Sequence, residues 1–321
     1  MSGVSTDNSV RGLLKRGIDQ LRTAEIGSYT LAAELLLLRA TSHDRTWIYS
    51  HPEEILPPDI ADNFFNLIRR RASGEPTQHL TGKQEFWGLE FAVSPDVLIP
   101  RPETEHLVEV ALDRLAVREL RAGRDPRLTG KNVTLVDIGT GSGCIAVALA
   151  KELPDATVYA TDISAAALAV AERNADRLGF ADRIQFIQSN LLDVFSPQDP
   201  PKAAGTSPFE SPITSHESPL LDLIVSNPPY IGLQEVDSLP IEVRVHEPAQ
   251  ALFGGQEGYE LYAGLILQAA RHLATGGLLV LELGHNSLPA VQPLLDSFSW
   301  TKIAVTKDLA GIDRVLSAEK V

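Results

Sequence analysis

From residue 133 onward, short apolar runs alternate with amphipathic stretches, and this alternation constrains the fold more than any other feature of the chain. Apolar strands that alternate with helices are typical of a parallel sheet covered by helices on both faces. The sequence therefore predicts a doubly wound α/β domain with a mostly parallel, seven-stranded sheet. The expected strands are 133–138, 157–161, 183–188, 221–226, 277–283, 301–306 and 312–317.

The front of the chain has a helical pattern. Apolar residues recur at helical spacing within 10–21, 31–38 and 60–68. Pro57-Pro58 is expected to open the last of these helices and Gly74 to close it, because proline is favoured at the first helical position and glycine just past the end. We expect a small helical domain over 1–75.

Two further segments complete the predicted organisation. Aromatic and β-branched residues between Thr77 and Ile99 predict a β-hairpin over 76–100 that links the helical domain to an α/β domain over 101–321. Within that domain, 196–219 contains six prolines and five serines without an apolar period. Such a composition predicts a disordered surface insert, because it offers too little apolar surface for a core.

Composition narrows the class of protein. Hydrophobic residues make up 44% of the 321 residues, enough for a sizeable core. The single cysteine, Cys144, excludes an internal disulfide, and the histidines show no metal-ligand spacing, so we expect no metal. A net charge of −14 disfavours nucleic acid as a partner. No apolar run approaches the ~20 residues of a membrane span, and we expect a cytoplasmic monomer.

A glycine-rich turn follows the first expected strand of the sheet. Residues 133–138 run directly into Gly139, Thr140, Gly141, Ser142 and Gly143, and a helix is expected from Cys144. Glycines at this place let the backbone approach a ligand at the carboxyl edge of the sheet. The spacing G-x-G-x-G differs from the dinucleotide pattern G-x-G-x-x-G, and a tight strand-to-helix turn alone would also explain it.

The next two strand ends carry polar residues that suit a nucleoside. Asp162 follows the second strand, where a carboxylate can accept from both hydroxyls of a ribose, although it also suits a helix N-cap. Asn190 and Leu191 follow the third, and we expect the Asn190 oxygen and the Leu191 N–H to contact an adenine. The glycine loop has no lysine or arginine for a phosphate. S-adenosylmethionine therefore fits this pocket better than NAD or ATP.

The fourth strand ends in Asn227-Pro228-Pro229-Tyr230. Proline has a fixed φ and no N–H, so the carbonyls here are held away from strand pairing and can accept hydrogen bonds. Together with the Asn227 side-chain oxygen they form an acceptor pair for a planar NH2 group, and the Tyr230 ring can lie on its flat face. Asn227 is also expected to contact the cofactor. A loop that only ends the strand is the alternative for an isolated match.

Taken together, these motifs resemble the class I amino-methyltransferases, and further residues resemble the release factor glutamine N5-methyltransferases of the HemK/PrmC type. The resemblance covers nearly the whole chain from Gly74 onward. The additional matching residues are Gly74-Glu75-Pro76-Thr77-Gln78, Phe86-Trp87, Phe91 and Val93, Leu98-Ile99-Pro100-Arg101-Pro102-Glu103-Thr104-Glu105, Val243-Arg244, Glu247-Pro248 and Asp308-Leu309-Ala310-Gly311-Ile312-Asp313-Arg314-Val315. The chain departs from the family at Asn190, where Asp is more common, and at His79, where Tyr is usual.

The resemblance implies transfer of a methyl group from S-adenosylmethionine to the glutamine of the Gly-Gly-Gln motif in peptide chain release factors, with the helical domain docking that protein. The runner-up is N6-adenine methylation of DNA or RNA, which the acidic charge disfavours. A silent S-adenosylmethionine-binding scaffold is the third hypothesis. We expect Arg101 to pair with Glu103 or Glu105, with a place in a lid over the cofactor as the alternative.

Overall fold

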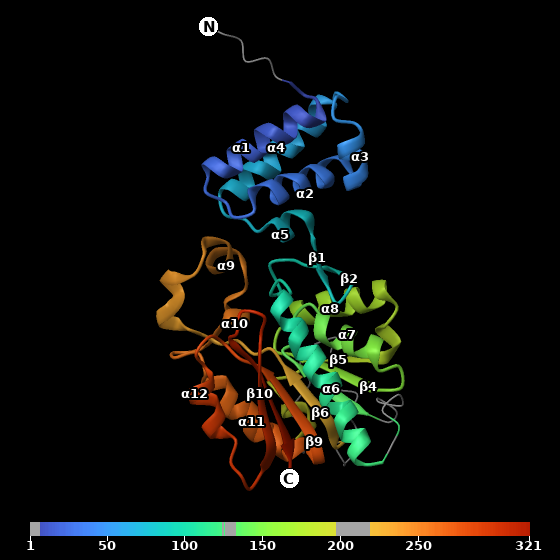
Figure 1. Cartoon of the computed structure of the whole chain (residues 1–321), viewed down its shortest axis with the longest axis vertical. Helices are drawn as coiled ribbons and strands as arrows, with labels where there is room; N and C mark the ends of the chain where they lie inside the picture. The colour runs from blue at the N-terminus through green and yellow to red at the C-terminus, as the bar shows by residue number, and fades with distance from the viewer. Residues whose placement is uncertain (1–6, 124, 126–132, 197–218) are drawn as a thin grey trace, which may run out of the picture. The chain divides into compact units, whose positions relative to one another are not determined.

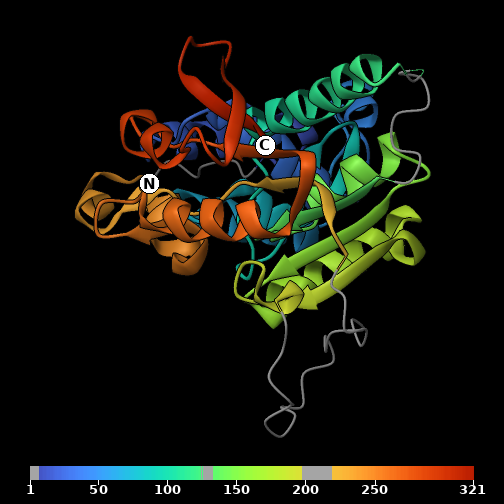
Figure 2. The same cartoon turned by 90° about the horizontal axis from the view of Figure 1, so that it is seen from below.

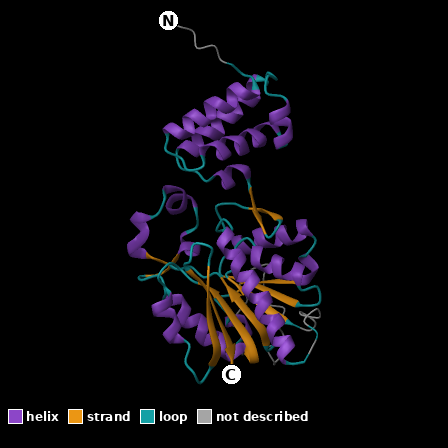
Figure 3. Cartoon of the chain, viewed as in Figure 1, coloured by secondary structure: helices purple, strands orange, loops and turns teal. Residues whose placement is uncertain are grey.

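The computed structural model describes residues 7–123, 125, 133–196 and 219–321, which divide into two compact units. One unit comprises the chain up to Lys83 together with Pro240–His246, and the other comprises Gln84–Leu239 and Glu247–Val321. Figure 3 shows that the first is built of helices and that the large sheet belongs to the second. Residues 197–218 of the predicted insert lie outside the described residues.

The helical unit has one apolar core, to which α1, α2 and α4 contribute most of the residues. These are the three helices expected from the apolar spacing, and Pro58 and Gly74 stand at the two ends of α4 as predicted. Two further helices, α3 and α5, lacked a long enough apolar pattern to be recognised. The bounds are α1 Val10–Thr23, α2 Tyr29–Thr41, α3 Arg45–Ser50, α4 Pro58–Ala72, α5 Thr77–Thr81 and α9 Ile241–His246.

Helix α9 is distant in sequence from the rest of the helical unit. Arg71 Nη2 pairs with Glu242 Oε2 at 2.5 Å, and the Arg71 side chain is only 7% exposed. The α carbon of Gly74 lies so close to Ile241 that a Cβ added there would come within 2.7 Å of a methyl carbon. This short helix is therefore held to α4 by close packing and by an ion pair whose arginine is buried and whose glutamate is exposed. The hairpin predicted over 76–100 begins with helix α5, and its strands are β1 Lys83–Phe86 and β2 Leu89–Ala92. The predicted domain boundaries remain predictions.

The second unit contains the seven-stranded sheet, in the order β10-β11-β9-β6-β3-β4-β5. β11 runs antiparallel to both of its neighbours, and the other pairings are parallel, which confirms the predicted fold class. Their bounds are β3 Thr134–Ile138, β4 Thr157–Asp162, β5 Ile184–Gln188, β6 Leu221–Ser226, β9 Leu273–Glu282, β10 Trp300–Lys307 and β11 Asp313–Lys320. β9 begins earlier than predicted because it contains a bulge around Gly276, where φ is +77°.

Alternate residues of the strands face two separate cores. Leu135 and Val158 belong to a cluster with α6 Glu105–Arg121 and α7 Cys144–Glu152, whereas Val136 and Tyr159 belong to a cluster with α11 Glu260–His272. Figure 1 labels these elements, and Figure 2 shows α6 and α11 flanking the sheet. The strand order reverses between β3 and β6, and in such sheets ligands bind at the carboxyl edge near this point.

No helix in the described part of the chain combines the length and the apolar character that crossing a membrane would require.

Candidate active site

A cavity of about 320 Å³ lies at the carboxyl ends of β3, β4, β5 and β6. Its walls contain eight of the residues predicted from sequence: Gly139, Gly141, Asp162, Asn190, Leu191, Asn227, Pro228 and Pro229. Four other predicted residues do not line it: Thr140, Ser142, Gly143 and Tyr230. The structure thus brings together the four strand ends that the sequence singled out, and it gives the remaining residues supporting positions.

The glycine turn exposes its backbone to this cavity. The N–H groups of Gly139 and Thr140 both donate to the Thr161 carbonyl, at 2.8 and 2.9 Å, which holds the turn against β4. Gly141 has φ +55°, and the nearest atom to the position where its Cβ would be is the Gly139 carbonyl oxygen, at 4.0 Å. A ligand can therefore approach the main chain closely here.

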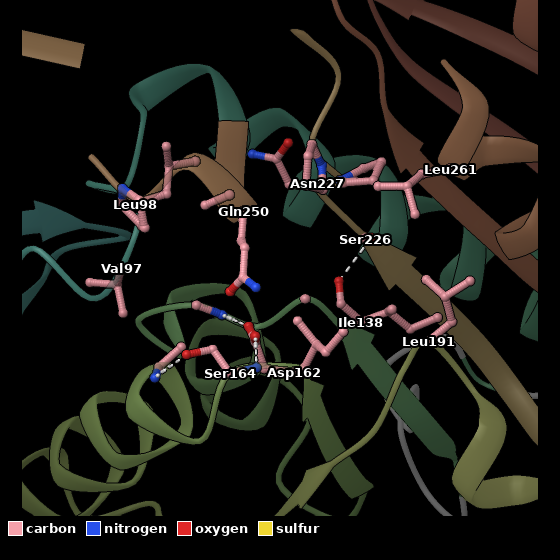
Figure 4. Close-up of a pocket in the computed structure, with 18 of the residues that line it drawn as sticks. Val97, Leu98, Ile138, Asp162, Ser164, Leu191, Ser226, Asn227, Gln250 and Leu261 are labelled. Atoms are coloured by element: carbon pink, nitrogen blue, oxygen red, sulfur yellow. Dashed lines mark hydrogen bonds between the residues drawn. The ribbon is translucent and has the colours of Figure 1, made fainter. Parts of the chain in front are cut away.

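Asp162 connects the glycine turn with α8 Ala165–Leu178. Its carboxylate accepts from the Gly141 N–H and from the Ser164 N–H, each at 2.9 Å (Figure 4). Burial raises the pKa of this carboxyl. Each carboxylate oxygen has two lone pairs, so both retain one for hydroxyl groups of a ligand. Ser164 is the N-cap of α8, which leaves Asp162 available to the cavity.

Hydrogen bonds on the far side of the cavity wall hold two of the predicted residues, Thr140 and Ser142. Asp137 Oδ2 accepts from the Thr140 hydroxyl at 2.6 Å and from the Ala146 N–H at 3.2 Å. Burial raises the pKa of the Asp137 carboxyl to about 7. The Ser142 carbonyl accepts from Asn174 Nδ2 at 2.9 Å. Thr140 and Ser142 thus hold the turn in shape instead of facing a ligand.

At the end of β5, Asn190 Nδ2 donates to Asp193 Oδ2 at 3.3 Å, which commits its amino group and leaves its carboxamide oxygen without a partner in the described residues. Leu191 adopts a left-handed φ of +52°, so the chain turns sharply beside the cavity. These features agree with the Asn190 oxygen as an acceptor and the Leu191 N–H as a donor for the edge of a flat ring.

The side-chain amide of Asn227 has a defined polarity. Its Nδ2 donates to the Thr104 hydroxyl at 3.1 Å, and Thr104 is 2% exposed. With its amino group committed, Asn227 has its Oδ1 left as an acceptor. Asn227, Pro228 and Pro229 line the cavity, so the acceptors of this turn face the same cavity as the ends of β3, β4 and β5.

Tyr230 is not among the residues that line the cavity, and its place in the substrate site remains a prediction. Its ring packs against Gly284, where an added Cβ would come within 2.8 Å of the ring, and its hydroxyl lies 3.5 Å from Glu282 Oε1. Burial raises the pKa of the Tyr230 hydroxyl. The ring is half-buried beside the cavity wall and supports the turn from behind.

Sequence analysis named Glu247 only as part of the resemblance and did not foresee that its carboxylate joins two walls of the cavity. Arg101 pairs with Glu247 at 2.5 Å, not with Glu103 or Glu105, and the Ile99 N–H donates to the same carboxylate at 3.3 Å. The Glu247 side chain is 1% exposed. Its neighbour Gln250 points into the cavity toward Asp162 (Figure 4). The available signal in the sequence was a charged residue next to a proline, Glu247 before Pro248, but this signal does not predict which residue Glu247 pairs with.

Within the described residues, no group of three or more histidine, cysteine, aspartate or glutamate side chains is arranged to hold a metal ion.

The sheet order and a pocket built from the first four strand ends define a class I methyltransferase. The solved structure of the hMettl16 catalytic domain in complex with MAT2A 3′UTR hairpin 6 supports the fold, with a TM-score of 0.50, 17% identity and coverage of 78% of this chain and 81% of that one. Residues 12–82 match the PrmC N-terminal domain and 129–203 a methyltransferase domain.

Proteins of similar sequence show which family of class I methyltransferases the chain belongs to. The release factor glutamine methyltransferase of Moorella thermoacetica is 40% identical, covering 97% of this chain and 98% of the relative, and that of Koribacter versatilis is 39% identical, covering 96% and 98%. That of Nitratidesulfovibrio vulgaris is 38% identical over 100% of this chain and 98% of its own. The chain belongs to the release factor glutamine methyltransferases.

Proposed function

We propose that this protein transfers a methyl group from S-adenosylmethionine to the side-chain amide nitrogen, N5, of a glutamine in the Gly-Gly-Gln motif of peptide chain release factors. The observation that carries the proposal is the polarity of Asn227, whose Nδ2 is committed to Thr104 while its Oδ1 remains an acceptor at the pocket. Names and identities of the relatives support the same substrate.

The pocket residues fit S-adenosylmethionine. Asp162 would accept from the ribose hydroxyls, Asn190 and Leu191 would contact the adenine, and the Gly139 to Gly143 turn would lie along the remainder of the molecule. Two features support this fit: the accessible main chain around Gly141 and the lone pairs that the Asp162 carboxylate retains as acceptors. When bound, this cofactor supplies an electrophilic methyl group on a sulfonium.

The chain itself contributes orientation and electrostatics. An amide nitrogen is a weak nucleophile because its lone pair is delocalised into the carbonyl. Asn227 Oδ1 and the Pro228 carbonyl would accept its two hydrogens, which holds the lone pair toward the methyl donor. One of these hydrogens would leave as a proton to solvent when the nitrogen gains the methyl group, while the carbon–sulfur bond of the donor would break and its electron pair would stay on the sulfur. Among the described residues that line the pocket, Asp96 and Asp162 are the only titratable ones.

A direct test is intact-mass analysis of purified release factors after incubation with this protein and S-adenosylmethionine. The expected result is a gain of one methylene unit, located on the Gly-Gly-Gln glutamine by fragmentation, and loss of the gain when that glutamine is replaced by alanine. Methylation of DNA or RNA with no change in the release factors would overturn the proposal. Activity should also show little of the steep salt dependence of nucleic-acid binding.

Removal of the Asp162 carboxylate tests the cofactor site. Asp162→Ala is expected to weaken S-adenosylmethionine binding by about 10–100-fold, because hydrogen bonds to a charged acceptor contribute about 1.5–3 kcal/mol. Isothermal titration calorimetry measures the affinity. Asp155→Ala, at a turn residue outside the pocket lining, is the control. An Asp162→Ala affinity equal to that of the unaltered protein would exclude the carboxylate from the site.

We also propose that residues 1–75 dock the release factor and that the protein acts as a cytoplasmic monomer without a nucleic-acid or membrane partner. The match of 12–82 to the PrmC N-terminal domain and the net charge of −14 support these points. Sedimentation of the protein with and without a release factor tests the stoichiometry.

A further inference from the structure

Gln250 extends a polar side chain into the cavity but has no part in the proposed binding of S-adenosylmethionine. It belongs to the short helix α10 Ala249–Leu252 and is exposed. Figure 4 shows its carboxamide reaching into the cavity toward Asp162, with no hydrogen bond to the residues drawn around it. It has no hydrogen-bond partner elsewhere in the described part of the chain either. An exposed glutamine is ordinarily only solvated, but the surroundings of Gln250 indicate a ligand.

Three of the described residues that line the cavity carry a side-chain amide, and two of these amides have a fixed polarity. Asn190 Nδ2 donates to Asp193, and Asn227 Nδ2 donates to Thr104. Both therefore present an oxygen, which is an acceptor, to the cavity. No partner holds the amino group of Gln250, so its carboxamide is free to present an NH2 group with two donors.

The helix that carries Gln250 is anchored at both ends. Before the helix, the Glu247 carboxylate accepts from Arg101 at 2.5 Å and from the Ile99 N–H at 3.3 Å, and the Glu247 side chain is 1% exposed. Leu252, the last residue of the helix, is 3% exposed. These contacts fix the main chain at Gln250, so only its side chain has to adjust when a ligand enters.

The diol of a ribose needs donors as well as acceptors. Asp162 is proposed to accept the protons of both hydroxyl groups, and an ionised carboxylate can only accept. Each hydroxyl oxygen then keeps lone pairs that lose their water when the ligand enters the cavity, and an acceptor left unpaired in a protein site is costly. The Gly141 N–H does not meet this need, because it already donates to Asp162 at 2.9 Å.

We propose that Gln250 is a further cofactor-binding residue, whose NH2 group donates to the ribose hydroxyl oxygens of S-adenosylmethionine on the side away from Asp162. The inference rests on the proposed function, which places this cofactor in the cavity. Asp162 accepts from the diol and Gln250 donates to it, so the two side chains together recognise both hydrogen-bonding capacities of the hydroxyl groups. Gln250 thereby favours ligands whose ribose diol is intact.

The first test measures cofactor affinity by calorimetric titration. Gln250→Met keeps the length of the side chain and removes its polar group, and it is expected to weaken S-adenosylmethionine binding by about 3–10-fold, the equivalent of one neutral hydrogen bond. Gln250→Glu should weaken binding at least as much, because a carboxylate has no donor and would face Asp162. Gln20→Met, the same substitution at an exposed helical position of α1 outside the cavity wall, is the matched control.

The second test identifies the ligand groups that Gln250 contacts. The product S-adenosylhomocysteine and two analogues that each lack one ribose hydroxyl are titrated into the unaltered protein and into Gln250→Met. The substitution is expected to weaken binding of S-adenosylhomocysteine and to have a smaller effect on at least one analogue, because that analogue has already lost the contact. A purely structural role of Gln250 would lower the affinity for all three ligands by the same factor.

Unchanged affinity in Gln250→Met, full affinity in Gln250→Glu, or an equal loss for S-adenosylhomocysteine and both analogues would overturn the inference. Methylation of a release factor adds a kinetic criterion: KM for the cofactor should rise in Gln250→Met while kcat stays within about twofold, as for a contact made equally before and during the reaction. The titrations need no release factor. A protein that binds the cofactor through Gln250 but leaves release factors unmethylated would therefore contradict the proposed function alone.

Discussion

Replacement of Asn227 by alanine is expected to lower kcat for methylation of a release factor by about 10²–10³-fold, the loss typical for removal of one preorganised polar group at a reacting centre. The substitution removes the Oδ1 acceptor and leaves only the Pro228 carbonyl to hold the substrate NH2 group. The nitrogen then rotates freely, and its lone pair faces the methyl donor for a small fraction of the time. Single-turnover methyl transfer with excess enzyme measures the effect directly.

The same variant should keep most of its cofactor affinity, because Asp162 and the glycine turn lie on other strands. Calorimetric titration with S-adenosylmethionine and thermal unfolding therefore control for damage to the fold. Near-normal turnover in Asn227→Ala would contradict the proposed mechanism. A joint loss of cofactor binding and stability would instead assign Asn227 to the structure of the pocket.

The elements predicted correctly from sequence are those whose signals are local. The strands of the sheet appear as short apolar runs, and Gly139 to Gly143, Asp162 and Asn227 follow them directly. Because parallel strands end at the same edge, a list of strand ends already describes most of the pocket wall. Helices α3 and α5, with six and five residues, are too short to show an apolar period.

The contacts that escaped prediction join residues far apart in sequence. Glu247 with Arg101, Glu242 with Arg71 and Thr104 with Asn227 are separated by 146, 171 and 123 positions. A charged or hydroxyl side chain does not specify its partner, and the nearer Glu103 and Glu105 were equally plausible for Arg101. Only the fold selects among such partners, so the outer walls of the pocket and the support behind Asn227 required the structure.

A second large effect is expected at Gly254, which lies in the two-stranded sheet of β7 Ile231–Gly232 and β8 Phe253–Gly255 beside the Asn227–Tyr230 turn. A Cβ at this position would overlap the carbonyl oxygens of Pro229 and Gly258. Both obstacles are main-chain atoms and cannot rotate away. Gly254→Ala must therefore displace the turn, and we expect a loss of stability of about 1–3 kcal/mol, as for overpacked interiors.

The displacement should also reduce kcat by about 10²-fold, because a shift of about 1 Å in a group that orients a reactant costs that much. Chemical denaturation and single-turnover kinetics measure the two effects. Gly27→Ala is the control for the stability measurement, since no atom lies within 4 Å of its Cβ position and its φ is outside the left-handed region. Should Gly254→Ala turn over within about twofold of the unaltered protein, the turn would tolerate movement, and orientation by a rigid turn would no longer explain how a weak amide nucleophile is methylated. A loss of stability with unchanged turnover would indicate that Gly254 serves the fold alone. A loss of both stability and turnover would tie the rigidity of the Asn227–Tyr230 turn to the reaction.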